Sequence, residues 1–579
     1  MVQPPACSSR MRSRGSASCV HEEMANAEPA RPSRTRDVVA IYRVLLGLLL
    51  VWQSFITRRL LAQALPVASD SSLRFRYPGF PLAPLPLSPA RQADLSAVLQ
   101  AVLGIAFASG KWTRGVAFAS LIVLMHTLLL EVSLYQNHYW LLCNVLVCFV
   151  VADHRPDILQ ALLRFVHSLP YAFGAVAKLS ADWLVRQQPV TRWCADIRAP
   201  WLSKHFLASP WCPTVLSVGG LVIDAAMVPL LCLPARYRVV AHILALSFHV
   251  ANATLFHIGI FPFVMLSSHV LWMDLSRQPI TRHPLAPQLA NDAPARRAGM
   301  GLSTARRRRP IQSQTAEEEP TAKATATGKS PGHRGLYAWC IMFVLFHLTW
   351  PLRRWVLYNT VSLWSHEGYL GAWQMKQMQL DGLALLVFSN GAADALELLT
   401  GQDNTGMEYP IILAPQLDPE LTPHQRAFVA ARPHMLLQYA QHRTALLRTP
   451  GSGQQSHMTA RAVSCFSLNN RSPQPLYRAD RGLPPVSEYE WLGVSGIGVW
   501  LHPLRDPQTT SGPSAECTAL LRRPQALLRR LRAGFHELRK AATLDKSELA
   551  NETEARDQEV TQSVVYWHHV GALRSLVDG

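Results

Sequence analysis

The sequence predicts an α-helical bundle that crosses a membrane about nine times, followed by a smaller mixed α/β region. Hydrophobic residues make up 49% of the 579 residues and charged residues only 16%, whereas soluble domains carry about 25% charged residues. The apolar residues are concentrated in long runs between about 38 and 275 and again near 337–349. A helix needs a run of about 20 apolar residues to cross a bilayer.

The apolar runs divide into eight segments before residue 276 and a ninth that begins at Leu336. The first runs from Val38 to about Ile56 and has arginines at both ends. Several others are short or contain proline. Because irregular backbone at membrane depth is tolerated only where protein or a cavity covers it, we expect a cavity inside the bundle. The other predicted spans are 95–109, 115–134, 137–153, 158–177, 213–234, 239–257, 260–275 and 336–352.

Two polar stretches, 1–36 and 276–335, are rich in basic residues, and the whole chain has a net charge of +18. Neither stretch has apolar periodicity, so both are predicted to be disordered and cytosolic. Positive charge is typical of cytosolic loops, and we favour this over a nucleic-acid-binding role for the arginine run. The predicted parts are a disordered N-terminus (1–36), the bundle (37–275), a disordered basic loop (276–335), the last span with a Trp-x-Met segment (336–378), a luminal mixed domain (379–505) and a helical or disordered tail (506–579).

The C-terminal third is predicted to lie on the luminal side, because nine spans carry the chain across from the cytosolic N-terminus. Glycosylation sequons at Asn470 and Asn551 are consistent with that face, and we expect a protein of the endoplasmic reticulum membrane. Ala384–Phe388 and Ala462–Leu468 have strand-like composition. Pro524–Ala541 is an Arg-rich amphipathic helix by pattern, typical either of a solvated helix or of one lying on a membrane surface.

Ten cysteines are scattered without the paired spacing of a zinc site, and the sequence contains no HExxH motif. We therefore predict no metal site. Cys194, Cys212, Cys465 and Cys517 are candidates for disulfides, and the spacing leaves their connectivity open. The cysteines inside apolar runs are most simply packing residues.

Ionisable residues inside membrane spans are costly, so each marks a candidate functional site. Lys178 ends an apolar, small-residue run that begins at Tyr171. A low dielectric disfavours the ammonium form of a lysine, and a neutral amine can act as a general base near neutral pH. The alternative is a lysine at a helix end whose ammonium group reaches the membrane interface.

Other polar residues fall at the ends or in the middle of predicted spans. His138 and His154 lie at the start and the end of the fourth span, where interface residues are equally common. Asp224 and Glu131 are intramembrane candidates, with polar packing between helices as the alternative. A stripe with roughly helical spacing on the seventh span would line a polar cavity or bind a ligand; it consists of His242, His249, Asn252, Phe256 and His257.

Four segments of the bundle carry motifs in a fixed order: Asn137–Leu142 closed by Val151–His154, then Ala177–Trp183, Gly219–Asp224 and Phe248–Leu266. They resemble, in turn, the NHxYLxxLLAF span that ends in a histidine, the KLxxDW and GGLLxDL segments, and the FHxxNxxLFxIGxFPxxML signature of vitamin K-dependent gamma-glutamyl carboxylases. The membrane core of that family is a horizontally transferred transmembrane domain. Beyond the bundle the resemblance thins to three segments, Trp373–Met375, Arg432–Ala440 and Val463–Gln474.

The resemblance implies an enzyme that oxygenates vitamin K hydroquinone to its epoxide and uses this reaction to carboxylate protein glutamate. The family removes a proton from the glutamate γ-carbon, which then captures CO2. By residue match, Lys178 is the base that deprotonates the hydroquinone, and His154 is the histidine that assists it. The implied candidates for the quinone pocket are His249, Asn252, Trp183 and His138.

The implied cofactor is vitamin K hydroquinone, with O2 and CO2 as co-substrates. The implied partners are membrane lipid, a quinone and a Glu-containing protein, with no nucleic acid. Three alternatives stay open on the sequence. One is a quinone epoxidase or oxidoreductase that lacks carboxylation, the second is a non-enzymatic membrane binding or assembly protein, and the third is a transporter, although no inverted repeat is seen.

Overall fold

The structure is a computed structural model that describes residues 32–65, 73–77, 87–197, 204–256, 258–273, 331–358, 364–374, 377–389, 395–400, 410–448, 458–485, 500–504, 514–521 and 524–541. The predicted disorder of the N-terminus, the basic loop and the end of the tail falls almost entirely outside these residues. His257, Met375 and the sequon at Asn551 also lie outside them.

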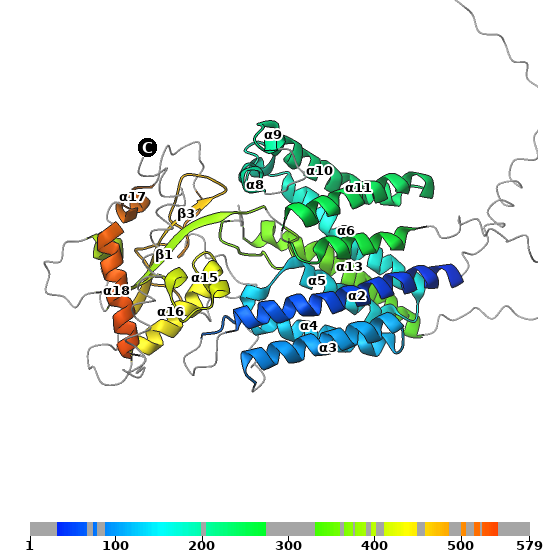
Figure 1. Cartoon of the computed structure of the whole chain (residues 1–579), viewed down its shortest axis with the longest axis horizontal. Helices are drawn as coiled ribbons and strands as arrows, with labels where there is room; N and C mark the ends of the chain where they lie inside the picture. Colours follow the sequence, from blue (N-terminus) through cyan, green and yellow to red (C-terminus); the bar gives the residue numbers. More distant parts are fainter. Residues whose placement is uncertain are drawn as a thin grey trace, which may run out of the picture.

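Long helices form one bundle, and a smaller region that contains a sheet lies at one end of it (Figure 1). α2 (Pro32–Ala64) begins at the end of the bundle farthest from this region and runs toward it (Figure 1). The other bundle helices are α3 (Pro89–Ser109), α4 (Thr113–Leu130), α5 (Asn137–Ala152), α6 (Pro156–Lys178), α10 (Trp211–Cys232), α11 (Ala235–Leu255), α12 (Phe261–Ser268), η2 (His269–Trp272) and α13 (Pro331–Leu357). The short helices α7 (Ala181–Leu184), α8 (Val190–Asp196) and α9 (Lys204–Leu207) lie between α6 and α10.

Among the described residues, six helices are long and apolar enough to cross a membrane: α2, α3, α4, α10, α11 and α13. Each overlaps a predicted span, so the structure confirms a helical bundle with several candidate spans. The remaining predicted spans form α5 with 16 residues, α12 with 8, and α6 with 23. α5 and α12 are short, while α6 carries Asp157, Arg164 and Lys178 among its apolar residues. The count of nine spans therefore stays a prediction.

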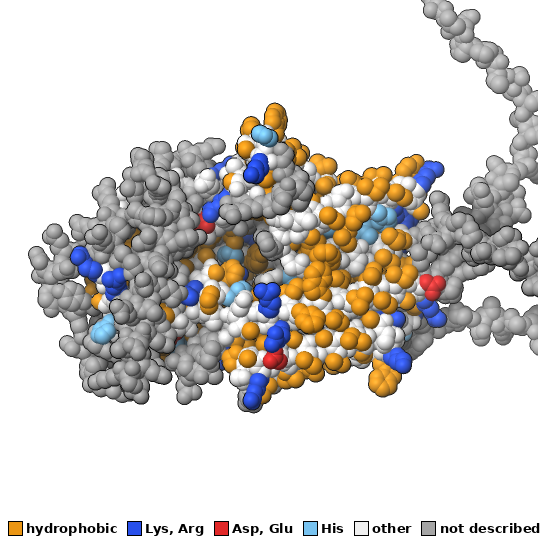
Figure 2. Space-filling view, viewed as in Figure 1, with side chains coloured by type: hydrophobic (Ala, Val, Ile, Leu, Met, Phe, Trp, Pro, Cys, Tyr) orange, Lys and Arg blue, Asp and Glu red, His pale blue; other side chains and the backbone are white. Residues whose placement is uncertain are grey.

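The outer surface of the bundle is apolar. Figure 2 shows hydrophobic side chains over its visible face, with most basic side chains near its two ends. Large apolar side chains on α2, α3, α4, α10, α11 and α13 are exposed, Phe55, Ile105 and Ile341 among them. Soluble monomers rarely expose so large an apolar surface, and an apolar belt with charged ends suits a bilayer.

The packing of α2 against α3 depends on two glycines. A Cβ added to Gly47 would lie 2.6 Å from the carbonyl oxygen of Gly104, and one added to Gly104 would lie 2.9 Å from the carbonyl oxygen of Gly47. Small residues at such crossings let two membrane helices approach backbone to backbone. The two helices therefore make a tight, directly packed pair.

The C-terminal region is built on a three-stranded antiparallel sheet with the order β2-β1-β3. β1 (Leu380–Ser389) pairs along its whole length with β3 (Thr459–Leu468). These strands contain both predicted strand segments, which are thereby confirmed. β2 (Ile411–Leu413) was not predicted, because three residues are too few to show an alternating pattern.

Helices cover this sheet. α18 (Pro524–Ala541) has the predicted bounds, and its Leu531 and Phe535 are buried in the core that includes the sheet. Its Gly534 lies against the backbone of Ile412 in β2. The apolar face of α18 is therefore occupied by the sheet, which decides against a helix lying on a membrane surface. The other elements are η1 (Val132–Leu134), α14 (Ala395–Thr400), η4 (Pro415–Leu417), α15 (Pro423–Val429), α16 (Pro433–Leu447) and α17 (Ala515–Leu521).

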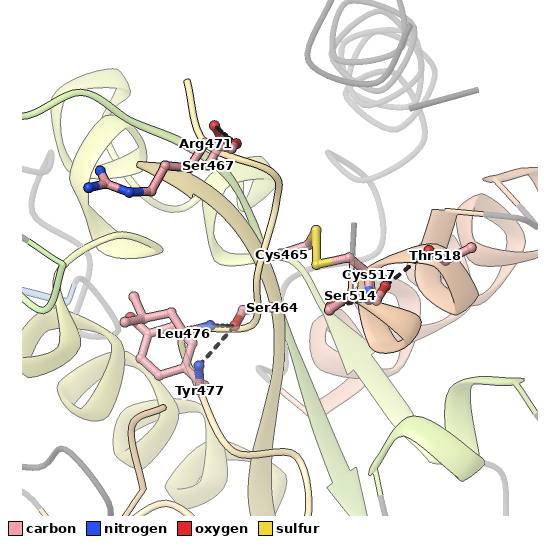
Figure 3. Close-up of a disulfide and its surroundings, with 9 residues drawn as sticks. All are labelled: Ser464, Cys465, Ser467, Arg471, Leu476, Tyr477, Ser514, Cys517 and Thr518. Carbon is pink, nitrogen blue, oxygen red and sulfur yellow. Dashed lines mark hydrogen bonds between the residues drawn. A yellow bond between two sulfur atoms is a disulfide. The ribbon is translucent and has the colours of Figure 1, made fainter. Parts of the chain in front are cut away.

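Two disulfides join the four cysteines that the sequence singled out. Cys465 of β3 is bonded to Cys517 of α17 (Figure 3). Cys194 of α8 is bonded to Cys212 of α10. Figure 1 places α8 and α17 on the side of the molecule that carries the C-terminal region. Both cross-links therefore lie on the same side of the bundle.

Buried polar contacts fix the C-terminal region to the bundle. Asp182 of α7 accepts hydrogen bonds from Arg471 Nη2 at 2.5 Å and from Asn469 Nδ2 at 3.0 Å. Glu131, one residue past the end of α4, is fully buried and accepts from Gln425 Nε2 at 3.2 Å. These contacts join residues that are almost three hundred positions apart, and they hold the two parts of the chain in one arrangement.

Candidate functional site

A cavity of about 690 Å³ lies where α5, α6, α10 and α11 meet the C-terminal region. Most of its wall is aromatic or aliphatic, with a few polar groups. Small-molecule sites in proteins typically have volumes of about 300–1,000 Å³ and this kind of wall. The bundle therefore lines a cavity, as expected, but the part of the chain after α13 completes the wall with Tyr369, Phe428 and Arg432.

Lys178 and Asp224 form a buried ion pair on the cavity wall. Lys178 is the last residue of α6, and its Nζ donates a hydrogen bond to Asp224 Oδ2 of α10. The Lys178 side chain is 12% exposed and the Asp224 side chain 7%. Two charges so far removed from solvent depend on each other, because losing one leaves the other uncompensated. The lysine therefore points to a carboxylate on a neighbouring helix instead of reaching for the membrane interface.

A glycine on α6 makes room for this pair, whereas a Cβ at the neighbouring glycine of α10 would make only ordinary contact with it. Gly174 lies one turn before Lys178 on α6, and a Cβ added there would be 2.8 Å from Asp224 Oδ2. Gly220 lies one turn before Asp224 on α10, and a Cβ added there would be 3.7 Å from Lys178 Cε. The space around the ion pair therefore depends on the absence of a side chain at position 174.

An aromatic wall begins beside the lysine. The ring of Trp183 has its centroid 5.3 Å from Lys178 Nζ, which is within cation–π range. Its Nε1 donates a 2.8 Å hydrogen bond to the carbonyl oxygen of Ser217, which fixes the orientation of the ring. Trp193 packs edge-on against Trp183, and Phe256 packs edge-on against Trp193. All three rings line the cavity.

The other predicted pocket residues lie around the same cavity. His138 lines it from the start of α5, and His249 and Asn252 line it from α11. His249 Nε2 is hydrogen-bonded to the Tyr171 hydroxyl at 2.6 Å. Among the described residues, His138 Nε2 and His249 Nδ1 have no hydrogen-bond partner. Leaving a buried polar atom unpaired costs free energy.

His154 lies elsewhere. It is exposed in the turn between α5 and α6 and does not line the cavity. Lys178 is at the opposite end of α6, and a helix of 23 residues has its ends roughly 33 Å apart. The structure therefore does not bring His154 to Lys178. The motif ends in a histidine as expected, but α6 carries the lysine away to the other side of the bundle.

Several lining residues were not predicted from the sequence, and two of them, Arg432 and Tyr369, come from outside the bundle helices. Arg432 reaches the cavity from the C-terminal region, with its guanidinium 4.0 Å from the ring of Phe428 and its Nη1 3.4 Å from the carbonyl oxygen of Val132. Burial lowers the pKa of Arg432. Tyr369 lies beside it on the cavity wall. Only the folded arrangement shows that these residues meet the bundle, because no local pattern connects them to it.

Residues 152–276 match a known domain family. The match is to the HTTM domain. It runs from the end of α5 to just past η2, so it contains Lys178 and Asp224 but neither His138 nor the C-terminal region. The HTTM domain is found in vitamin K-dependent gamma-carboxylase and related proteins. No solved structure matches the chain.

Proposed function

We propose that the chain is a vitamin K-dependent gamma-carboxylase-like enzyme, which couples epoxidation of vitamin K hydroquinone to carboxylation of protein glutamate. The observation that carries the proposal is the Lys178–Asp224 pair on the wall of a largely apolar cavity. The pair falls inside the HTTM match. The resemblance of four ordered motifs to that family points to the same chemistry.

The cavity suits a lipid-soluble quinone in size and in surface. Aromatic rings such as Trp183, Phe248 and Phe261 offer flat apolar faces to a naphthoquinone. Val215 of α10 and Ser247 of α11 line the cavity and are exposed. We propose that an apolar ligand enters the cavity from the bilayer between these two helices.

In the proposed reaction the hydroquinone, when bound with O2, supplies the oxidative energy that makes a base strong enough for the glutamate γ-carbon. Lys178 Nζ accepts the proton of a phenolic hydroxyl. To do so it must first give one proton to Asp224 Oδ2, which converts the ion pair into a neutral amine and a carboxylic acid. A dry cavity favours this exchange, because it removes two charges from a low-dielectric surrounding.

We propose that His138, in place of His154, is the histidine that assists Lys178. His138 is buried, lines the same cavity as Lys178, and has an unpaired Nε2 among the described residues. His249 and Asn252 stay candidates for the quinone pocket, since both line the cavity. His154 is left out because it is exposed at the far end of α6.

The glutamate substrate is proposed to approach from the side of the C-terminal region. Arg432 at the edge of the cavity offers a cation that can pair with its carboxylate. Two disulfides on this side support a luminal, oxidising location, and the sequon residue Asn470 is exposed there. We therefore propose an endoplasmic reticulum membrane protein with a luminal C-terminal region, whose partners are lipid, the quinone and a Glu-containing protein.

The test is a paired assay on the purified full-length protein in nanodiscs. It follows vitamin K epoxide formation and the incorporation of ¹⁴C-bicarbonate into a Glu-containing peptide. We expect both products from the wild type and neither from Lys178→Ala. Because that change leaves Asp224 as a buried unpaired charge, the double variant Lys178→Ala/Asp224→Asn tests the same loss without the penalty. Lys111→Ala, an exposed lysine in the turn between α3 and α4, is the matched control.

The outcomes separate the candidate functions. Lysine-dependent epoxide without labelled peptide would indicate a quinone epoxidase that lacks carboxylation. Neither product from a folded wild-type protein would favour a non-enzymatic membrane protein. Normal turnover by the folded double variant would refute the role of Lys178.

A further inference from the structure

A path of hydrogen-bonded side chains leads out of the cavity on the side away from the C-terminal region. It starts at His249, whose Nε2 lies 2.6 Å from the Tyr171 hydroxyl. The same hydroxyl lies 3.4 Å from Nε2 of His269 in η2. Nδ1 of His269 then lies 2.9 Å from Nδ1 of His242. His249, Tyr171 and His269 are buried, and His242 is half-buried.

This hydrogen-bonded path runs along the axis of α11 and not across the bundle. His242 and His249 are on the same helix, and their separation of seven positions corresponds to about 10 Å along α11. His249 lines the cavity, whereas His242 lies one turn from Arg238, near the start of α11. Nη1 of Arg238 donates a 2.6 Å hydrogen bond to the carbonyl oxygen of Trp272, the last residue of η2. The His242 end of this hydrogen-bonded path is therefore close to the end of the bundle opposite the C-terminal region.

We propose that His249, Tyr171, His269 and His242 form a proton-transfer path between the cavity and the membrane face opposite the C-terminal region. One set of tautomers allows transfer throughout. His249 accepts a proton at Nδ1 and releases one from Nε2 to the tyrosine oxygen. The tyrosine hydroxyl proton passes to His269 Nε2, and the proton on His269 Nδ1 passes to His242. One proton enters and one leaves through His242 Nε2, so no charge accumulates and no group is oxidised or reduced.

A second tyrosine–histidine pair in the same bundle shows what distinguishes this path. The Tyr42 hydroxyl lies 3.1 Å from His167 Nε2, and His167 Nδ1 lies 2.8 Å from the carbonyl oxygen of Leu163 on its own helix. Both ring nitrogens of His167 are therefore used, but the second ends at a backbone carbonyl that cannot pass a proton on. In His269 both nitrogens meet side chains that can, and Tyr171 is the bridge between two imidazoles.

The path goes beyond the proposed function and does not depend on it. Any reaction in the cavity that takes up or releases a proton could use it, whatever the substrate. Its test therefore needs no substrate. The full-length protein is reconstituted into liposomes that contain the pH indicator pyranine, and a potassium gradient with valinomycin drives protons across the membrane. The initial rate of internal pH change is the measured quantity.

We expect the wild type to conduct protons faster than protein-free liposomes and Tyr171→Phe to lose that excess. Phenylalanine keeps the ring that packs in the bundle and removes only the bridging hydroxyl. His242→Phe at the half-buried end of the path is expected to lose it too, and it serves if Tyr171→Phe does not fold. Tyr42→Phe is the matched control and should conduct like the wild type.

Three results would overturn the proposal. The first is a wild type that conducts no faster than protein-free liposomes. The second is a folded Tyr171→Phe or His242→Phe protein that conducts at the wild-type rate. The third is an equal loss in Tyr42→Phe, which would show that the flux is a general leak of the bundle. Failure of the carboxylase assay would leave all three readings unchanged, because none of them involves turnover.

Discussion

At position 174 a single methyl group would reach the carboxylate that pairs with Lys178. The Cβ of Gly174→Ala would lie 2.8 Å from Asp224 Oδ2, so the carboxylate or the helix must shift. We expect hydroquinone turnover to fall about tenfold or more, since small displacements of reacting groups have effects of this size. Gly115→Ala on α4 is the control, because its Cβ would meet nothing within 4 Å and Gly115 does not line the cavity. Wild-type turnover by a folded Gly174→Ala protein would argue against a role for the pair.

A single residue could be predicted as functional where the sequence shows that placing it in an apolar run costs free energy. Lys178 stands out because a lysine at the end of an apolar run needs an explanation. Its partner Asp224 is 46 positions away, and only the packing of α6 against α10 shows that the two meet. The histidines illustrate the same limit. His138 lies at the start of α5 and His154 just past its end, and the direction in which α6 leaves that helix decides which of them shares the cavity with the lysine.

The tight crossing of α2 and α3 makes a prediction at the scale of helices. Gly104→Leu would place a side chain within 3 Å of the Gly47 carbonyl oxygen and close to the backbone nitrogen and a side-chain methyl group of Val51. Overpacking of this kind typically costs about 1–3 kcal/mol. We expect a lower melting temperature in detergent for Gly104→Leu. Gly115→Leu on α4 should melt like the wild type, because its Cβ has open space around it; equal losses in both variants would point to a cause other than the crossing.

Elements were predictable where length and pattern agreed. The six long apolar helices and the two long strands appear where the sequence places them. α6 is the instructive exception among the helices. Its buried face carries residues such as Leu159, Leu163 and Val166, while Asp157 and Arg164 lie on other faces. Hydropathy alone therefore does not single out α6 as a membrane span, although this helix carries the candidate catalytic lysine.

At the scale of the whole molecule, the contact between the bundle and the C-terminal region contains the carboxyl group of Glu131. Ionisation of this group destabilises the contact. Burial raises the pKa of Glu131 from 4.5 to about 7. Between these values the folded protein keeps a proton that the unfolded chain releases. Glu131 therefore contributes most to the free energy of unfolding below about pH 4.5. As pH rises to about 7 this contribution falls by about 3 kcal/mol at most.

Glu131→Gln removes this pH dependence, because the amide stays neutral and still accepts the hydrogen bond from the backbone N–H of Phe75, which is 3.0 Å long in the wild type. We expect the melting temperature of the wild type to fall relative to the variant as pH rises from about 4.5 to 7. A constant difference between the two proteins over that range would show that Glu131 does not change its ionisation on folding.

The docking of the two parts lay beyond prediction from the sequence. The mixed composition of the C-terminal region, its strands and α18 are local features. The hydrogen bonds of Asp182 with Asn469 and Arg471 are not, since they join positions far apart along the chain. The docked region closes one side of the cavity with Tyr369, Phe428 and Arg432, and the contribution of these three residues could not be anticipated from the sequence.

The most direct test of the central claim is to locate a bound quinone. A photoreactive naphthoquinone would be cross-linked to the full-length protein in nanodiscs, and the labelled peptides identified by mass spectrometry with and without excess vitamin K. We expect labels on the segments of α10 and α11 that line the cavity, around Gly219–Asp224 and Phe248–Asn252, and we expect vitamin K to remove them. Labels confined to other helices, or labels that vitamin K does not displace, would contradict the assignment of this cavity as the quinone site.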